Sequence, residues 1–89
     1  MSISIETRLL DGAEYIISSD EMYRLGLEAS LGVDSADLVV AHKWFNLAAM
    51  QGHVEARTYR KELSLEMSPE QIAEAQRQAR EYLSEVRPN

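Results

Sequence analysis

The sequence predicts an all-α fold built from antiparallel helical hairpins, and three observations support this prediction. Apolar residues recur at helical spacing from Met22 to the C-terminal region. Glycines at Gly32 and Gly52 and serine-led capping signals divide this region into about four helices. Between residues 25 and 56, small and large apolar residues flank a glycine loop, which requires two helices whose backbones lie close together.

Length and composition limit the class of protein. A chain of 89 residues is one domain at most. It has no cysteine and two histidines, which excludes a disulfide-built domain and argues against a metal or cofactor site. No apolar run reaches the roughly 18 residues that a membrane span needs. The N-terminal residues lack the features of a signal peptide, so we expect a cytoplasmic protein.

The net charge of −6 is unevenly distributed. Residues 1–52 carry eight acidic and three basic residues, whereas residues 53–89 carry seven and six. Binding to nucleic acid requires clustered lysine and arginine to displace counterions from phosphates. The acidic first half therefore argues against a nucleic-acid partner.

Residues 1–17 give conflicting signals. Alternating apolar residues begin at Ile3, and the pair Asp11-Gly12 is a favoured hairpin turn. Apolar residues up to Ile17 also recur at helical spacing, which favours a helix. We expect an N-terminal arm that is either a short helix or extended.

The first predicted helix spans about 19–31. Ser18 and Glu21 form the two ends of a capping box, and Gly32 ends the helix in a left-handed conformation. The stripe that we expect to pack on the second helix is Met22, Leu25, Gly26 and Ala29. Because Gly26 has no side chain, we expect this helix to approach the second helix closely where Ala48 or Ala49 lies.

The second predicted helix spans about 35–51, with Asp34 or Ser35 as its N-cap and Gly52 as its stop. It is apolar around most of its circumference, so it needs neighbours on two sides. The narrow polar face that remains consists of His42, Lys43, Asn46 and Met50.

Two further helices complete the prediction. The third spans about 53–66 and has a thin apolar stripe of Ala56, Tyr59, Leu63 and Met67. The fourth spans 69–86, because Ser68 and Gln71 form a capping box around Pro69. Its outer face is rich in Glu, Gln and Arg, which is typical of a helix that closes the end of a repeat array.

The stretch 22–56 also carries a specific pattern of glycine, alanine and aromatic residues. Its members are Leu25-Gly26, Gly32-Val33, Asp37, Ala41, Trp44-Phe45, Ala48-Ala49, Gly52 and Ala56. In type, order and spacing this pattern resembles the Sel-one-like repeat, a relative of the tetratricopeptide repeat made of two antiparallel helices. The resemblance implies a right-handed solenoid fragment in a small bacterial protein.

The resemblance divides the chain into three parts. These are an N-terminal arm at 1–17, a Sel-one-like repeat at 18–56, and a degenerate second hairpin at 57–89 that acts as a cap. Arg60-Lys61 stands where a second repeat would have Leu-Gly, so we expect only one intact repeat. Repeat arrays usually need about three units for stability, so the arm, a second copy or a partner must cover the open end.

Residues that suggest chemistry are few. His42 and Trp44 could be taken for a cofactor site, but a surface or core-edge histidine and a core tryptophan are the simpler interpretations. His53 lies eleven positions from His42, beyond a helix stop, and no acidic pair stands at metal-ligand spacing beside it. We therefore expect no enzymatic activity, no metal and no cofactor.

In tetratricopeptide-like folds the first helix of each hairpin lines a groove that holds a partner peptide. The resemblance therefore implies a non-enzymatic protein–protein interaction adaptor with contacts from Tyr23, Arg24, Leu27 and Glu28. These residues could equally cover the arm at 1–17. Two other functions remain open: a homodimer formed through the exposed repeat end, and a small acidic regulator of a basic protein surface. None of the three involves nucleic acid or a membrane.

Overall fold

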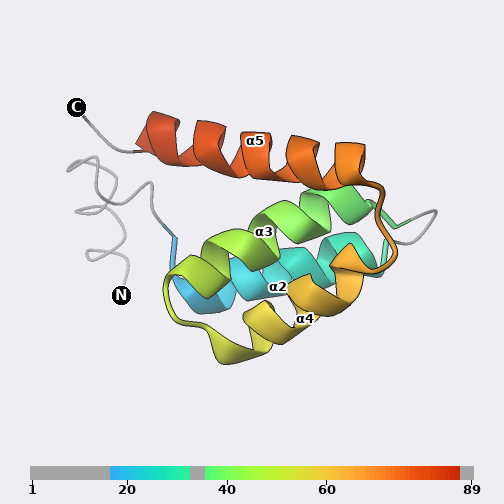
Figure 1. Ribbon diagram of the computed structural model, residues 1–89. Helices are drawn as coiled ribbons and strands as arrows, with labels where there is room; N and C mark the ends of the chain where they lie inside the picture. The colour runs from blue at the N-terminus through green and yellow to red at the C-terminus, as the bar shows by residue number, and fades with distance from the viewer. Residues whose placement is uncertain (1–16, 33–35, 87–89) are drawn as a thin grey trace, which may run out of the picture.

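The computed structural model describes residues 17–32 and 36–86, and this part of the chain contains four α-helices (Figure 1). They are α2 (Ser19–Ser30), α3 (Leu38–Met50), α4 (Val54–Ser64) and α5 (Pro69–Val86). The described residues contain no β-strand, so the predicted all-α class is confirmed. Except for Ile17, the predicted arm lies outside the described residues.

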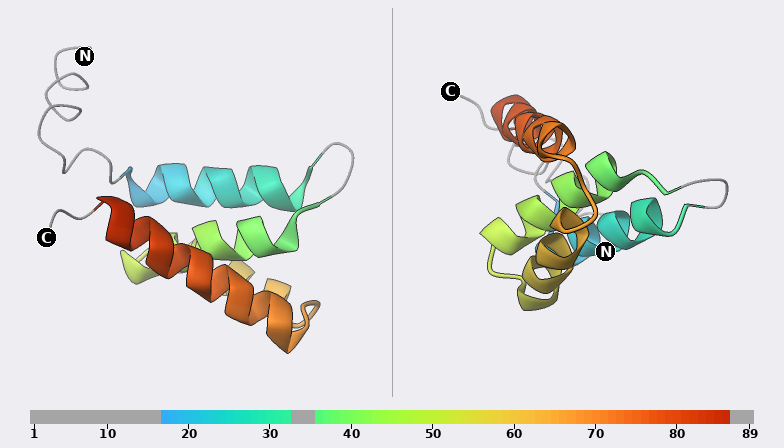
Figure 2. Two further views of the ribbon diagram at one scale, coloured as in Figure 1. Left: turned by 90° about the horizontal axis from the view of Figure 1, so that it is seen from above. Right: turned by 45° about the vertical axis from the view of Figure 1, so that its right-hand side comes forward.

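Helix α3 is the centre of the arrangement, because α2, α4 and α5 all pack against it. Helices α2 and α4 run antiparallel to α3, whereas α5 runs in the same direction as α3 on another side of it (Figures 1 and 2). The principal contacts of α4 and of α5 are made with α3 rather than with each other. Helices α4 and α5 therefore pack against each other less extensively than α2 and α3 do.

The burial of α3 confirms that it has neighbours on more than one side. Its buried residues are Ala41, His42, Phe45, Leu47 and Ala48. The four apolar ones join Met22, Ala56 and Ala79 from the other three helices in one hydrophobic core. The prediction that His42 lies on the polar face is wrong, since its side chain is only 3% exposed.

Serine capping boxes begin α2 and α5, as predicted. The Ser18 hydroxyl accepts from the Glu21 N–H at 3.1 Å, and the Glu21 carboxylate accepts from the Ser18 N–H at 3.2 Å. Ser68 and Gln71 form the equivalent pair at 3.1 and 2.9 Å. Each box satisfies two backbone groups at a helix end that would otherwise lack partners.

Helix α3 begins later than predicted. Its N-cap is Asp37, whose carboxylate accepts from the Val40 N–H at 3.1 Å. The Asp37 N–H also donates to the Ala29 carbonyl near the end of α2, at 2.9 Å. The predicted caps, Asp34 and Ser35, lie outside the described residues, and the structure gives Asp37 as the N-cap.

Gly52 ends α3, as predicted. Its φ is +90°, a conformation that residues with a Cβ rarely adopt. The Gly52 N–H donates to Ala49 and the His53 N–H donates to Ala48, which is the pattern of a Schellman motif. The turn sends the chain directly into α4, for which His53 is the N-cap.

The outer face of α5 carries the ion pairs expected of a solvated surface. Arg77 bonds to Glu74 at 2.6 Å and to Glu81 at 3.3 Å. The hydrogen bond from Arg77 lowers the pKa of Glu74 to about 2. None of the described helices is long and apolar enough to cross a membrane.

Candidate functional site

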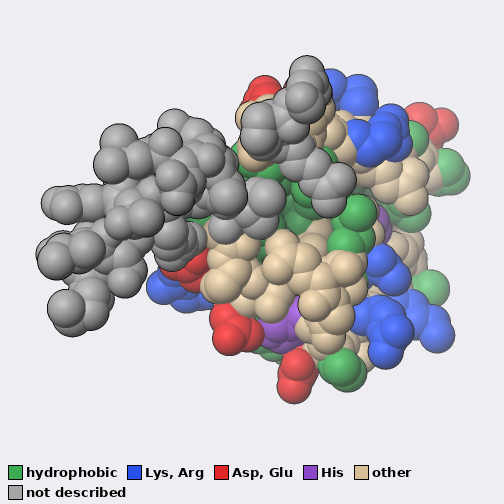
Figure 3. Space-filling model, turned by 90° about the vertical axis from the view of Figure 1, so that its left-hand side faces the viewer, with side chains coloured by type: hydrophobic (Ala, Val, Ile, Leu, Met, Phe, Trp, Pro, Cys, Tyr) green, Lys and Arg blue, Asp and Glu red, His purple; other side chains and the backbone are tan. Residues whose placement is uncertain are grey.

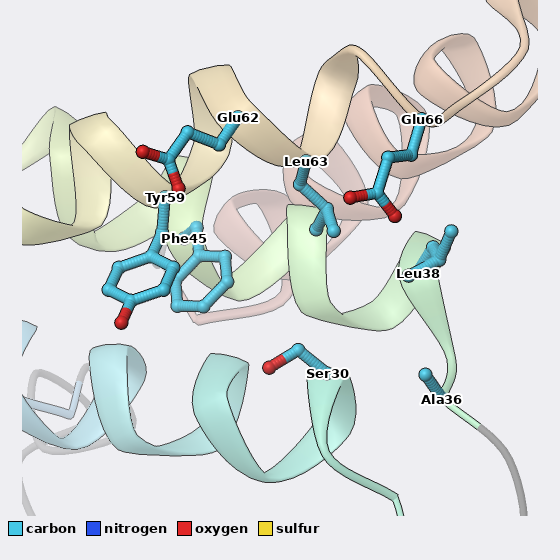
Figure 4. Close-up of a pocket in the computed structure, with 8 residues that line it drawn as sticks. All are labelled: Ser30, Ala36, Leu38, Phe45, Tyr59, Glu62, Leu63 and Glu66. Atoms are coloured by element: carbon cyan, nitrogen blue, oxygen red, sulfur yellow. The ribbon is translucent and has the colours of Figure 1, made fainter.

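An open groove of about 290 Å³ lies between the end of α2, one side of α3 and the second half of α4 (Figure 4). Helix α3 contributes an apolar floor, and α4 contributes an aromatic and aliphatic wall with acidic neighbours. The lining residues are Ser30, Ala36, Leu38, Phe45, Tyr59, Glu62, Leu63 and Glu66. Mixed apolar and polar linings of this kind are typical of sites that bind another molecule.

Phe45 fixes the base of the groove. Its side chain is fully buried, and its ring lies directly against the backbone of Gly26 in α2. A Cβ placed on Gly26 would lie 2.5 Å from Phe45 Cε1. The missing side chain at Gly26 therefore makes room for the Phe45 ring, whereas the sequence pattern predicted a close approach to Ala48 or Ala49.

Tyr59 forms the wall next to Phe45. The two rings stack with centroids 5.4 Å apart and an angle of 21° between their planes. Tyr59 is 42% exposed, so one side of its ring packs on the core while the rest faces solvent. The aromatic surface continues to Tyr23 of α2, whose ring centroid is 5.9 Å from that of Tyr59.

Tyr23 packs into the molecule more than the sequence pattern indicated. Its ring stacks on His53 at 4.4 Å and also approaches Phe45 at 6.0 Å. Burial raises the pKa of Tyr23, with smaller contributions from Tyr59 and Glu55. The ring connects α2 to the start of α4 and is only half-available to a partner.

His53 joins the N-terminal ends of α2 and α4. Its Nδ1 accepts from the Ala56 N–H at 3.2 Å, so the proton of the neutral ring resides on Nε2. Nε2 lies 3.1 Å from a carboxylate oxygen of Asp20. Figure 3 shows acidic side chains around a histidine on this face, in agreement with the positions of Asp20 and Glu55. The contacts of His53 with Ala56 and Asp20 hold the ends of α2 and α4 together, so we assign His53 a structural role.

The four residues predicted to contact a partner differ in exposure, and none of them lines the groove. Tyr23 and Leu27 are partly buried and pack against the core. Arg24 and Glu28 are exposed on α2. The groove instead brings together residues that sequence reasoning assigned to the α4 stripe, such as Tyr59, or did not consider.

One pattern in the sequence could have identified the groove residues that the prediction missed. Glu62 and Glu66 are four positions apart, and Tyr59 and Leu63 have the same spacing, so all four share one side of a helix. An acidic pair beside an apolar pair is a recognisable pattern. Its proximity to Ser30 and Ala36 depends on the tertiary arrangement, which local spacing does not reveal.

His42 and Trp44 are explained by packing. The Ser64 hydroxyl donates to the Arg60 carbonyl at 2.8 Å, so its oxygen accepts from His42 Nε2–H at 3.0 Å. His42 Nδ1 is buried and has no hydrogen-bond partner among the described residues. Burial lowers the pKa of His42, and the charge of Arg60 lowers it further.

Trp44 is half-buried and packs edge-on against Tyr82 of α5, with centroids 5.2 Å apart. Lys43 Nζ lies 4.6 Å from the centre of the Trp44 ring, within the range of a cation–π interaction. These contacts attach α5 to α3 on the side away from Tyr59.

The described residues contain no group of three or more His, Cys, Asp or Glu side chains that could hold a metal ion. Comparison with protein-family models found no match. Searches of curated proteins and of solved structures also found no significant match.

Proposed function

We propose that the chain is a non-enzymatic protein–protein interaction adaptor of the Sel-one-like repeat type. The groove between α2, α3 and α4 is the observation that carries this proposal. Leu38 and Leu63 offer apolar surface beside the half-exposed Tyr59, over the fully buried Phe45. A surface that combines aromatic and aliphatic groups with a polar edge suits a partner protein.

The arrangement of the helices also supports the proposal. Helices α2 and α4 run in the same direction, and the rings of Tyr23 and Tyr59 bring them side by side (Figure 1). In repeat proteins, equivalent helices of successive hairpins align in this way and form the binding surface. The same proposal places the protein in a bacterial cytoplasm.

The exposed face of α2 extends the proposed surface. Arg24 and Glu28 are exposed and stand one turn apart, so a partner that extends from the groove over α2 can contact them. Tyr23 and Leu27 contribute mainly by holding α2 against the core. We therefore assign polar contacts to Arg24 and Glu28, and a supporting role to the other two.

A pull-down from cells of the source organism tests the proposal. Ala36 is exposed and lines the groove, so Ala36→Trp fills the groove without removing a core contact. We expect the variant to recover about tenfold less of any specific partner, which corresponds to ~1.4 kcal/mol of binding free energy.

Ala73→Trp is the matched control, because Ala73 is exposed on α5 away from the groove. Both variants are checked for an unchanged thermal melt. If Ala36→Trp recovers the same partners as the wild-type chain, in the same amounts, the groove is not the docking site.

A homodimer is the second candidate function. Leu31, Met50, Val54 and Leu65 are large apolar side chains that are 60–85% exposed. Scattered exposed apolar residues are common, but several at the ends of helices also suit a contact between two copies. Light scattering at high micromolar concentration distinguishes the candidates, since a dimer has twice the 10.1 kDa mass of one chain.

A further inference from the structure

The charges on α4 are divided between two sides of the helix. Glu62 and Glu66 line the groove together with Tyr59. Around the helix axis, Arg57 lies about 140° and Lys61 about 100° from Glu62, given the helical rotation of about 100° per residue. The groove therefore lies beside Glu62 of α4 and Glu66 of the turn that follows this helix.

Within the described part of the chain, the two groove glutamates have no basic partner. Among residues 17–32 and 36–86, the recorded ion pairs of glutamates involve Glu55, Glu74 and Glu81. Arg60 also does not neutralise the groove, because its guanidinium donates to the Asn46 side chain at 2.8 Å. The carboxylates of Glu62 and Glu66 are thus available to a cation from outside.

The geometry around these carboxylates suits a long cationic side chain. Figure 4 shows the carboxylates of Glu62 and Glu66 on either side of Leu63, above the apolar floor. Lysine and arginine place an aliphatic stem on apolar surface and keep a charged head at its polar edge. The half-exposed ring of Tyr59 offers a further favourable surface to a cation.

We propose that the groove binds a basic segment of a partner protein, in which a lysine or arginine side chain inserts between Glu62 and Glu66. Apolar neighbours of this residue pack on Leu38, Leu63 and the Phe45–Tyr59 pair. The net charge of −6 attracts such a segment at long range and raises its association rate. This inference rests on the proposed adaptor function and specifies the chemistry of its partner.

Peptide titration of the ¹⁵N-labelled full chain, followed by NMR chemical shifts, tests the inference. The probes are acetylated and amidated pentapeptides of sequence Ala-Leu-Lys-Leu-Ala, and the same peptide with Gln or Glu in the middle. We expect the lysine peptide to bind about threefold to fivefold more tightly than the glutamine peptide, and the glutamate peptide most weakly. The largest shifts should fall at Tyr59, Glu62, Leu63 and Glu66.

Charge variants give the control. Glu62→Gln combined with Glu66→Gln should abolish the preference for lysine. Glu70→Gln combined with Glu85→Gln changes the net charge by the same amount on exposed positions of α5, and it should preserve the preference. An equal loss in both double variants would overturn the inference, because it would show attraction by net charge alone.

The outcomes separate this inference from the proposed function. If lysine and glutamine peptides bind equally at the groove residues, the predicted partner charge is wrong while the groove remains a docking site. If no peptide shifts any groove residue, the inference fails. The pull-down with Ala36→Trp then decides independently whether the groove binds a partner of different chemistry.

Discussion

Gly26 and Phe45 form the contact on which the groove depends. Gly26→Leu should lower the free energy of unfolding by about 1–3 kcal/mol, because any side chain at this position collides with the buried Phe45 ring. Urea denaturation measures the change. Ala73→Leu, on the exposed face of α5, is the control and should have little effect. An unchanged midpoint for Gly26→Leu would contradict the close contact.

His42 should make stability depend on pH. The pKa of His42 is lowered in the folded state, so near and below pH 6.5 the unfolded chain binds more protons than the folded chain. Its contribution is therefore fully present above pH 6.5 and is lost as the pH falls below that value. One proton gives a slope of at most about 1.4 kcal/mol per pH unit.

Urea denaturation at pH 7.5, 6.5 and 5.5 measures this slope, before most glutamates titrate. His42→Leu removes the titrating group and should flatten the profile over this range. A wild-type profile that already matches that of His42→Leu would show that His42 titrates normally in the folded protein.

At the residue scale, the sequence predicted which residues have special structural roles better than it predicted which residues they contact. The special role of Gly26 was predicted, but its neighbour is Phe45 rather than Ala48 or Ala49. His42 was placed on the surface because helical spacing does not show that α4 covers that side of α3. Identity and spacing specify a face, whereas the packed neighbour depends on how the helices cross.

At the element scale, boundaries were predicted best where a local signal was unambiguous. Helix α5 spans Pro69–Val86, as predicted, because Ser68, Pro69 and Gln71 all favour the same start. Helix α3 begins at Leu38, whereas the predicted start was about residue 35. This boundary was predicted less well because three neighbouring polar residues were all acceptable caps. The Asp37 N–H also donates to the Ala29 carbonyl, and local sequence signals do not reveal this contact between the ends of α2 and α3.

The capping boxes give a prediction at this scale. Ser68→Ala should cost about 0.5–2 kcal/mol, since it leaves the Gln71 N–H without its hydroxyl acceptor. Ser18→Ala should have a similar effect on α2. Thermal melts of both variants provide the measurement, with Ser84→Ala on the exposed surface of α5 as control. Equal melting temperatures for all three would contradict the role assigned to the caps.

At the scale of the whole molecule, the all-α class was predictable but the groove was not. Helical periodicity and caps determine the class, and the breadth of the apolar face of α3 predicted several neighbours. The groove arises from the relative positions of α2 and α4, which both pack on α3 and approach each other through Tyr23, Tyr59 and His53. The sequence therefore directed attention to α2 alone, while α4 supplies most of the charged and aromatic lining.

The central claim is that the groove between α2, α3 and α4 holds a partner protein. Photo-cross-linking in cells of the source organism tests it most directly, with a benzophenone amino acid placed at Ala36 in the groove or at Ala73 on α5. We predict that position 36 gives a cross-linked product with a different protein that carries a basic segment, and that position 73 does not. Identical products from both positions, or a product from position 36 that contains only this chain, would contradict the claim.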